Sequence, residues 1–307
     1  MNMKLWIVLP LLLAMTALSA WAFGQVEMQD VSGTITGTYD YSNELVVTEP
    51  FTVSYSGSNA VDYYIAFSAG SSGDVNNRTL TDGSGNTLSY QVMDSAISRN
   101  VLLDNGNAQT TNDVLAGSFS GAGQEAQSFD IVTFAGQFPP AGQYTDSLIL
   151  TSYTGAVGSG SLSRFAFTTV DVTVPSVVEL SLVDPGAPFN MAQSDYLLDF
   201  GALSAGNTRQ VDLVVRSNET FGVSIESANA GVMAIQLAGD SSTVPYVLSV
   251  DGSAADLSGG TPVSVLSSVG PTPLTGSRHS ISVQIQSFGN VTEGVYQDDL
   301  TIVVTAQ

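Results

Sequence analysis

One strand-like pattern occurs twice in this chain, 152 residues apart. It reads Gly-x-Tyr-x-Asp-x-Leu, from Gly142 to Leu148 and again from Gly294 to Leu300. In both copies apolar and polar residues alternate, which is the period of a half-buried β-strand. More strand-like sequence follows the first copy, whereas the second copy stands at the end of the sequence. This difference restricts the possible folds more than any other feature.

Two other pairs of segments repeat in the same order. Ser128–Ile131 corresponds to Ser280–Val283 at the same spacing of 152 residues. Thr87–Tyr90 corresponds to Thr243–Tyr246 at a spacing that is four residues longer. A repeat of this kind predicts related structural units along the chain. Short alternating runs separated by Gly, Ser and Asn turns are typical of an all-β sandwich. We therefore predict an all-β chain of two tandem β-sandwiches, over residues 23–174 and 175–307, with the boundary near Pro175.

The first 22 residues have the composition of a secretory signal. Lys4 precedes an apolar run from Leu5 to Leu18, and Ala20-Trp21-Ala22 fits a cleavage site that has small residues at its first and third positions. A membrane anchor is the alternative, although the run is short for a span of about 20 apolar residues. We therefore expect residues 1–22 to be removed after export.

Charge and cysteine content exclude several classes of partner and site. Cleavage would remove the only lysine and leave six arginines against 28 acidic residues, which is a formal charge of −22. Nucleic acids and anionic membranes bind basic patches, so neither is expected as a partner. The chain has no cysteine, which excludes disulfides, thiolate metal sites and cysteine nucleophiles.

The segment Phe165–Val174 decides which of the two domains is complete. It follows the first copy of the repeat and is long enough to close that sandwich, whereas nothing follows the second copy. A missing strand would expose unpaired backbone groups and an apolar groove. Filling the groove with about four apolar side chains, at roughly 1.5–3 kcal/mol each, would contribute roughly 6–12 kcal/mol before ordering costs. A strand from another chain can supply this energy.

Two alternatives to this assignment stay open. Phe165–Val174 could be the first strand of the second domain, which would leave the first domain incomplete. Pro175 favours the first domain, because proline suits a linker or the start of a strand better than its middle. The segment Phe23–Val31 alternates weakly at Val26 and Met28, so it could be a free donor strand of a stalk subunit.

The second half of the chain resembles the spore coat protein U domain family. The residues that carry the resemblance are Phe200-Gly201, Leu203–Gly206, Val214–Asn218 and the closing Gly294-x-Tyr296-x-Asp298-x-Leu300 pattern. The resemblance is close over residues 176–307 and looser over residues 23–174. Characterised members of this family are subunits of archaic chaperone–usher pili.

The resemblance implies an immunoglobulin-like fold that lacks its last strand. A periplasmic chaperone would fill the groove first, and a neighbouring pilus subunit would replace it at the outer-membrane usher, so that the protein is exported to the periplasm and then displayed on the cell surface. The terminal strand, through Tyr296, Leu300, Ile302 and Val304, would flank the groove. The resemblance also implies a two-domain organisation for tip adhesins of this class. Their complete N-terminal domain serves adhesion, and their incomplete C-terminal domain serves attachment.

Two apolar clusters in the first domain are candidate surface-binding loops. One consists of Phe134, Phe138, Pro139 and Pro140, and the other of Val101, Leu102 and Leu103. If they were exposed together, they would form an apolar patch. In the tip adhesins that the chain resembles, apolar loops contact host or abiotic surfaces. The alternative is that these side chains cap the sandwich.

Signals of catalysis or cofactor binding are weak. His279 is the only histidine, and a single histidine is usually structural. Asp82–Asn86 could offer oxygen ligands to calcium, but a plain turn explains it as well. We expect no enzyme activity, no cofactor and no metal. The main alternative function is a self-contained secreted binding module, for carbohydrate for example, with two complete sandwiches; a secreted hydrolase is the least favoured.

Overall fold

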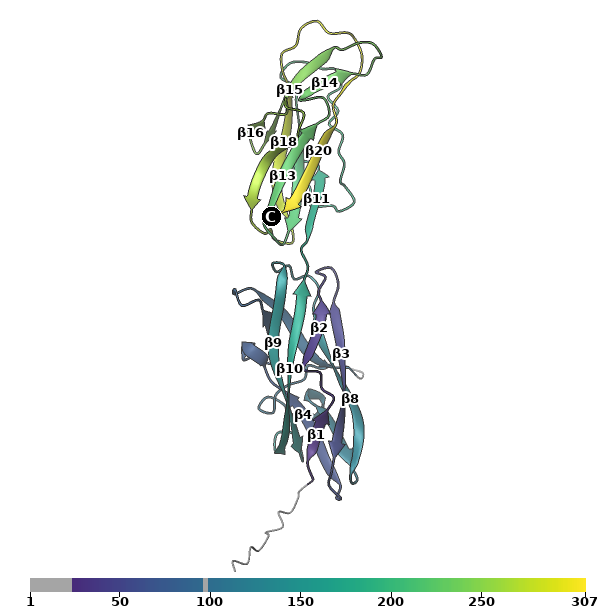
Figure 1. Cartoon of the computed structure of the whole chain (residues 1–307), viewed down its shortest axis with the longest axis vertical. Helices are drawn as coiled ribbons and strands as arrows, with labels where there is room; N and C mark the ends of the chain where they lie inside the picture. The colour runs from purple at the N-terminus through teal and green to yellow at the C-terminus, as the bar shows by residue number, and fades with distance from the viewer. Residues whose placement is uncertain (1–23, 96–98) are drawn as a thin grey trace, which may run out of the picture.

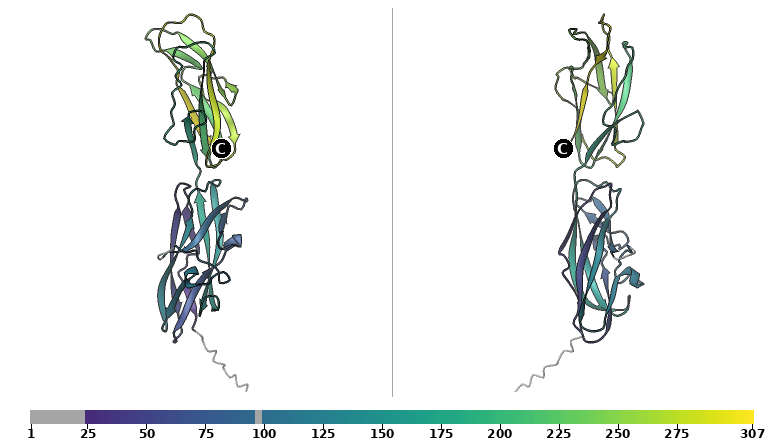
Figure 2. Two further views of the ribbon diagram at one scale, coloured as in Figure 1. Left: turned by 180° about the vertical axis from the view of Figure 1, so that it is seen from behind. Right: turned by 90° about the vertical axis from the view of Figure 1, so that its right-hand side faces the viewer.

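The computed structural model describes residues 24–95 and 99–307, so the predicted signal peptide lies outside the described residues. The described chain is almost entirely β-structure, which confirms the predicted fold class. It forms two immunoglobulin-like β-sandwiches placed end to end (Figures 1 and 2). Within the described ranges, no helix is both long and apolar enough to cross a membrane.

Ten strands build the first domain. They are β1 (Val26–Gln29), β2 (Thr34–Thr38), β3 (Leu45–Tyr55), β4 (Val61–Phe67), β5 (Thr79–Thr81), β6 (Thr87–Asp94), β7 (Leu115–Phe119), β8 (Gly123–Thr133), β9 (Gly142–Thr154) and β10 (Ser161–Val174), with short 3₁₀ helices η1 (Gly70–Ser72) and η2 (Thr111–Asp113). One layer has the order β1-β3-β8-β6, and the other has the order β2-β10-β9-β4-β7. Strand β5 connects the layers through β6 and β9. The core between them is rich in aromatic side chains, with Phe67 packing edge-on against Phe129.

Strand β10 closes the first sandwich. It pairs antiparallel with β9 from Ser161 to Val174 and parallel with β2 from Thr169 to Thr173. Every second side chain along its C-terminal half is buried, including Val170, Val172 and Val174. The segment Phe165–Val174 therefore lies in the sheet of the first domain, and the pairing contradicts its alternative placement in the second.

The segment considered as a free donor strand is also part of the first domain. Strand β1 pairs antiparallel with β3, and Val26 is fully buried in the core. The backbone N–H of Val26 donates a hydrogen bond to the hydroxyl of Ser163 on β10 at 2.9 Å. Strand β1 therefore completes its own sandwich and is not free for another subunit.

The second domain contains strands β11 to β20. They are β11 (Val178–Val183), β12 (Thr208–Ser217), β13 (Phe221–Ser227), β14 (Val232–Ile235), β15 (Thr243–Val250), β16 (Ser253–Ala255), β17 (Val263–Val269), β18 (Ser277–Ile285), β19 (Tyr296–Gln297) and β20 (Leu300–Ala306). The larger sheet has the order β11-β12-β18-β15-β14-β19, with β16 on β15, and the smaller sheet has the order β17-β13-β20. Among the described residues, no strand pairs with the second edge of β20.

A small set of polar and aromatic contacts joins the two domains. The hydroxyl of Tyr41 in the first domain lies 2.9 Å from both carboxylate oxygens of Glu179 on β11. The ring of Phe138 packs edge-on against Tyr41, with 5.1 Å between ring centroids. The backbone N–H of Ala141 donates to the carbonyl of Asn218 in the second domain. The loop that follows β8 therefore lies at the junction.

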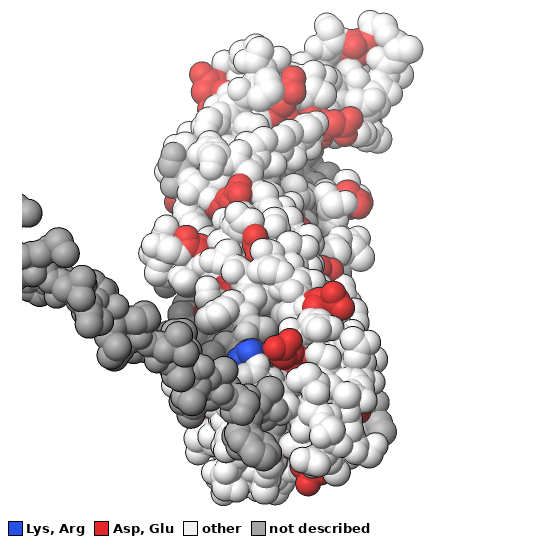
Figure 3. Space-filling model, turned by 60° about the horizontal axis from the view of Figure 1, so that its bottom comes forward, with Lys and Arg blue, Asp and Glu red and all other residues white. Residues whose placement is uncertain are grey.

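Acidic side chains dominate the charged surface, as the sequence predicts. Figure 3 shows them scattered over the end of the molecule that carries the first domain, where basic side chains are scarce. The described cations are mostly paired, for example Arg278 with Asp212 and Arg99 with Glu44. The surface therefore disfavours contact with polyanions.

Arg78 is the largest fully buried side chain of the first domain. Its guanidinium donates to four backbone carbonyls and one side chain, those of Ser68, Val75, Phe67, Leu102 and Gln91. Burial lowers the pKa of Arg78, although neighbouring acidic groups and Tyr90 oppose that shift. The side chain thereby fastens the loop before β5 and the segment after β6 to the core.

We expect Arg78→Met to destabilise the first domain by about 3–5 kcal/mol, because four buried carbonyls would lose their donor. Urea unfolding of the whole chain, followed by circular dichroism, measures the change. The exposed ion pair of Arg99 supplies a control, since Arg99→Met should cost less than about 1 kcal/mol. Equal effects of the two substitutions would contradict this role for Arg78.

Candidate functional site

An open groove runs between the two sheets of the second domain, beside the unpaired edge of β20. Its volume is about 980 Å³. Core side chains of the larger sheet form its floor, among them Val211 of β12, Leu248 of β15 and Val283 of β18. Leu300 and Ile302 of β20 line one wall, and residues 194–203 line another. The groove thus exposes the interior of the sandwich.

The two copies of the repeat differ in burial because only one is covered. In the first domain Tyr144, Leu148 and Leu150 of β9 are fully buried in the core that β10, paired beside β9, helps to enclose. Their counterparts Tyr296, Leu300 and Ile302 are only half-buried, although they point to the same side of the sandwich. The second domain therefore has the inward-facing residues of a complete sandwich without the strand that covers them.

The tyrosine of the repeat performs the same task in each domain. The hydroxyl of Tyr144 donates to the carbonyl of Pro140 at 2.8 Å, and that of Tyr296 donates to the carbonyl of Thr292 at 2.7 Å. A tyrosine at the start of a strand that bonds to the backbone a few residues upstream is the tyrosine corner of immunoglobulin-like folds. Burial raises the pKa of Tyr144 to about 12, so its hydroxyl remains a donor at neutral pH.

The aspartate of the repeat connects the two sheets in each domain. Tyr90 on β6 donates its hydroxyl proton to Asp146 at 2.8 Å, and Tyr246 on β15 donates to Asp298. Burial, and then the nearby carboxylate, raises the pKa of both tyrosines. Asp146 is 4% exposed, whereas Asp298 is half-buried and faces the groove. The sequence repeat is thus a repeat of hydrogen bonds.

We expect Tyr90→Phe to destabilise the first domain by about 1–3 kcal/mol, because buried Asp146 would lose a hydrogen-bond donor. Tyr246→Phe should have a smaller effect, because water reaches Asp298 through the groove. Urea unfolding of each variant as a whole chain measures both changes. If Tyr246→Phe proved the more costly substitution, Asp298 would be better sealed from water than the groove indicates.

Two segments about one hundred residues apart in sequence form the rims of the groove. One is the edge of β20 together with residues 293–299, and the other is the segment Ser194–Phe200. Along the latter, Tyr196, Leu198 and Phe200 are half-buried or buried, while Leu197 is 84% exposed. Such alternation is that of a strand, yet the segment has no ladder partner among the described residues. In the first domain, β10 lies between β2 and β9, and β9 is the counterpart of β19 and β20.

The structure places the predicted groove residues as follows. Tyr296, Leu300 and Ile302 line the groove, and Val304 continues the same face of β20 and packs against the core. The sequence analysis did not find the opposite rim or the floor. Alternation in residues 195–200 could have indicated the rim, but the floor comes from strands that sequence alone does not bring together.

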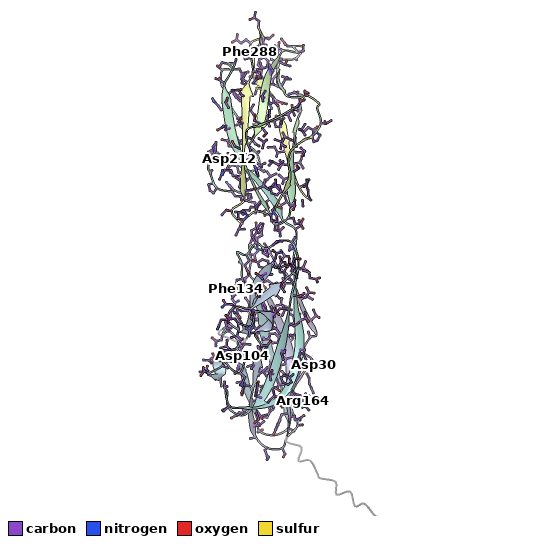
Figure 4. The ribbon with its side chains drawn as sticks, turned by 90° about the vertical axis from the view of Figure 1, so that its left-hand side faces the viewer. Asp30, Asp104, Phe134, Arg164, Asp212 and Phe288 are labelled. Atoms are coloured by element: carbon purple, nitrogen blue, oxygen red, sulfur yellow. The ribbon has the colours of Figure 1, made fainter. Side chains whose placement is uncertain are left out.

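The predicted surface-binding loops do not form one patch. Leu102 is fully buried and its N–H donates to the carbonyl of Val92, so its expected role in surface contact is wrong. Phe138 and Pro139 line a small pocket at the domain junction, with Pro140 beside them, and Val101 and Leu103 are half-buried elsewhere in the domain. Phe134 is 39% exposed but also lies at the junction end of the domain, away from Arg164 at the far end (Figure 4). For the residues other than Leu102, surface binding stays a prediction.

Exposed aromatic residues occur instead on the outer face of β10. Phe165 and Phe167 are 54% and 68% exposed, and Phe167 lies opposite Ile149 of β9, which is also exposed. The sequence analysis assigned this segment as a closing strand and did not distinguish its inward from its outward side chains. Counting back in steps of two from buried Val174 would have put both phenylalanines on the outer face.

The residues considered for metal binding or catalysis have structural contacts. One oxygen of Asp82 accepts the backbone N–H groups of Ser84 and Asn86, so its carboxylate closes the turn. His279 lies 2.7 Å from a carboxylate oxygen of Asp251 and packs edge-on near Phe221. Within the described residues, no group of three His, Cys, Asp or Glu side chains could hold a metal ion.

Fold and groove together define a two-domain β-sandwich protein whose second sandwich is open along one strand edge. Residues 17–151 match the model of the Spore Coat Protein U domain, which confirms the resemblance to this family over that part of the chain. The match lies on the first domain, whereas the sequence analysis found the closer resemblance in residues 176–307. It ends within β9, so β10 lies outside it.

The solved structures that the chain matches include several bacterial adhesins, each at a TM-score below 0.5. They include the CsuC–CsuE chaperone–tip adhesion subunit pre-assembly complex from archaic Csu pili of Acinetobacter baumannii, at 16% identity and a TM-score of 0.41, covering 89% of this chain and 99% of that chain. The CupB6 tip adhesin of Pseudomonas aeruginosa matches at 12% identity and a TM-score of 0.38, covering 91% and 94%. A mutant of the CfaE adhesin of enterotoxigenic Escherichia coli matches at 12% identity and a TM-score of 0.38, and the match covers 89% of this chain and 92% of that chain. No curated protein matches the chain.

Proposed function

We propose that this chain is an exported pilus subunit of the archaic chaperone–usher class, in which the second domain takes up a β-strand from another protein. The observation that carries the proposal is the open groove beside β20, at the position that β10 fills in the first domain. An exposed strand edge above an apolar groove favours the addition of a strand. The Spore Coat Protein U match over the first domain supports the same class of protein.

The order of the domains supports a tip adhesin within that class. The first domain is closed by its own β10, and its N-terminal strand β1 is held against β3. The chain therefore has an acceptor groove at one end and an occupied donor segment at the other. A periplasmic chaperone would fill the groove before assembly, and a neighbouring subunit would fill it at the usher. The first domain is then left to contact a host or abiotic surface, for which Phe165 and Phe167 are exposed candidates.

A self-contained secreted binding module is the alternative function. It requires two complete sandwiches, and the free edge of β20 together with the exposed Leu197 rim disfavours that state.

Hydrogen exchange with a strand peptide tests the proposal. The probe is a synthetic peptide with the sequence Arg164–Val174 in which Asp171→Gln removes the negative charge. Binding should slow amide exchange in β20 and in residues 194–200, with no change in β9, because β9 is already covered. A peptide of the same composition in scrambled order is the control. If no alternating apolar peptide protected β20, the strand-acceptor role would be refuted.

A further inference from the structure

The rims of the groove carry acidic side chains that form no ion pair within the described part of the chain. Its lining contains five acidic side chains and no basic one: Asp195, Asp199, Glu293, Asp298 and Asp299. Asp298 points inward and is held by Tyr246 and Ser227. The other four are exposed. None of the five forms an ion pair within the described residues.

Two of these carboxylates have no partner at all among the described residues. Neither Asp195 nor Glu293 accepts a hydrogen bond or meets a cation, whereas Asp199 accepts the N–H of Gly201 and Asp299 accepts from the Gln297 side chain. The guanidinium of Arg209 lies beside Asp199 but is directed to the backbone carbonyls of Asp199 and Thr208. Asp195 and Glu293 are on opposite rims, so a strand inserted between them would meet carboxylates on both sides.

Resting on the proposed function, we infer that the strand accepted by this groove is basic and comes from a different protein. Charge complementarity between an acidic rim and a cationic strand selects partners and speeds association. The chain itself has little to offer such a groove. Its expected mature form contains no lysine, and its N-terminal segment Phe23–Val31 carries Glu27 and Asp30. The rim therefore also repels further copies of this chain, which limits self-assembly.

The first domain indicates where on the donor strand the basic residues belong. Strand β10 is antiparallel to β9, and its C-terminal residue Val174 lies opposite Gly142, the counterpart of Gly294. The carboxylate of Glu293 is next to Gly294, at the same end of the groove. In this register, the outward-facing positions of the C-terminal half of the donor, equivalent to Asp171 and Thr173, lie closest to the acidic rim. We place the donor's lysines or arginines there.

Binding of four matched peptides to the whole secreted chain tests this inference. The parent peptide has the sequence Arg164–Val174 with glutamine at four of its five outward positions, namely 165, 167, 171 and 173, and keeps Thr169. Its variants carry lysines at 171 and 173, lysines at 165 and 167, or glutamates at 171 and 173. Dissociation constants are measured by calorimetry at roughly 20 mM and roughly 500 mM salt, where the Debye length falls from about 20 Å to about 4 Å.

The peptide with C-terminal lysines should bind at least about tenfold more tightly than the parent at low salt, and less than about twofold more tightly at high salt. The glutamate peptide should bind more weakly than the parent. The peptide with N-terminal lysines should gain less than its C-terminal counterpart. Equal gains from the two lysine placements would overturn the assigned position of the basic residues.

Variants of the protein show whether the rim causes the preference. Asp195→Asn with Glu293→Gln should reduce the lysine preference, which is the ratio of the dissociation constants of the parent and of the peptide with C-terminal lysines, to less than about threefold at low salt. Asp30→Asn with Asp62→Asn removes the same charge from the first domain and should leave the preference intact. If all peptides bound alike, the inference would fail and strand uptake would stand. If none bound, both would fail.

Discussion

Attaching a copy of β10 behind residue 307 is expected to raise the unfolding free energy of the second domain by at least about 3 kcal/mol. The appended strand would use residues 155–160 as its connection, as β9 and β10 do in the first domain. Its Val170, Val172 and Val174 would enter the groove, at roughly 1.5–3 kcal/mol for each buried valine. Ordering the new strand offsets part of this gain. The burial contrast between the two copies of the repeat predicts the direction of the effect.

Urea unfolding of the whole chain with and without the extension measures the gain, which should appear in the transition of the second domain only. The matched control carries Val170→Asp and Val172→Asp in the appended copy, since two buried aspartates would prevent insertion. A gain that persisted in this control would show that the extension acts without entering the groove. No gain from either extension would mean that the groove does not accept a strand in the β10 register.

Alanine substitution at equivalent positions of the repeat should show, through its effect on stability, which sandwich has a complete set of strands around its core. Leu148→Ala is expected to destabilise the first domain by about 3–5 kcal/mol, because Leu148 is fully buried and its removal leaves a cavity. Leu300→Ala should cost less than about 1.5 kcal/mol, because Leu300 is half-buried and borders an open groove. The two substitutions remove the same atoms from the same position of the same strand pattern.

The cost of Leu300→Ala should rise when β10 is appended, because the strand then encloses the cavity. A double-mutant cycle of Leu300→Ala against the extension isolates this coupling. Unfolding midpoints and slopes in urea give each corner of the cycle. An equal cost of Leu300→Ala in the extended and unextended chains would show that the added strand does not lie over Leu300. If Leu300→Ala cost as much as Leu148→Ala in the chain without the extension, the groove would be closed in solution.

The repeated Gly-x-Tyr-x-Asp-x-Leu pattern could be recognised in the sequence because its tyrosine and its aspartate each make the same hydrogen bond in both domains. The tyrosine donates a hydrogen bond to a carbonyl four residues upstream. The aspartate accepts one from the tyrosine that ends the aligned segments Thr87–Tyr90 and Thr243–Tyr246. Such contacts leave a fixed spacing in the sequence. Alternation along β9, β10 and β20 was equally readable, because a strand has a period of two.

The exposure of the loop residues was harder to predict from the sequence, because the exposure of a side chain depends on contacts with segments that are distant in the chain. Leu102 lies in a poorly patterned segment, yet the carbonyl of Leu102 accepts from buried Arg78 and its side chain fills the core. Phe138 lies in a short apolar loop that could have been a free tip. The position of the second domain, through Tyr41 and Glu179, places it at a junction instead.

The sequence by itself determined the fold class, the twofold repeat and the residues of the terminal strand, because these follow from side-chain alternation and spacing. Tertiary structure alone decided that β10 pairs with β9 and β2, that β1 is held in its own domain, and that the acidic rims around residues 195 and 293 face one groove. Strand pairing depends on hydrogen bonds between segments far apart in the chain. Those bonds determine which side chains are covered and which remain open to a partner.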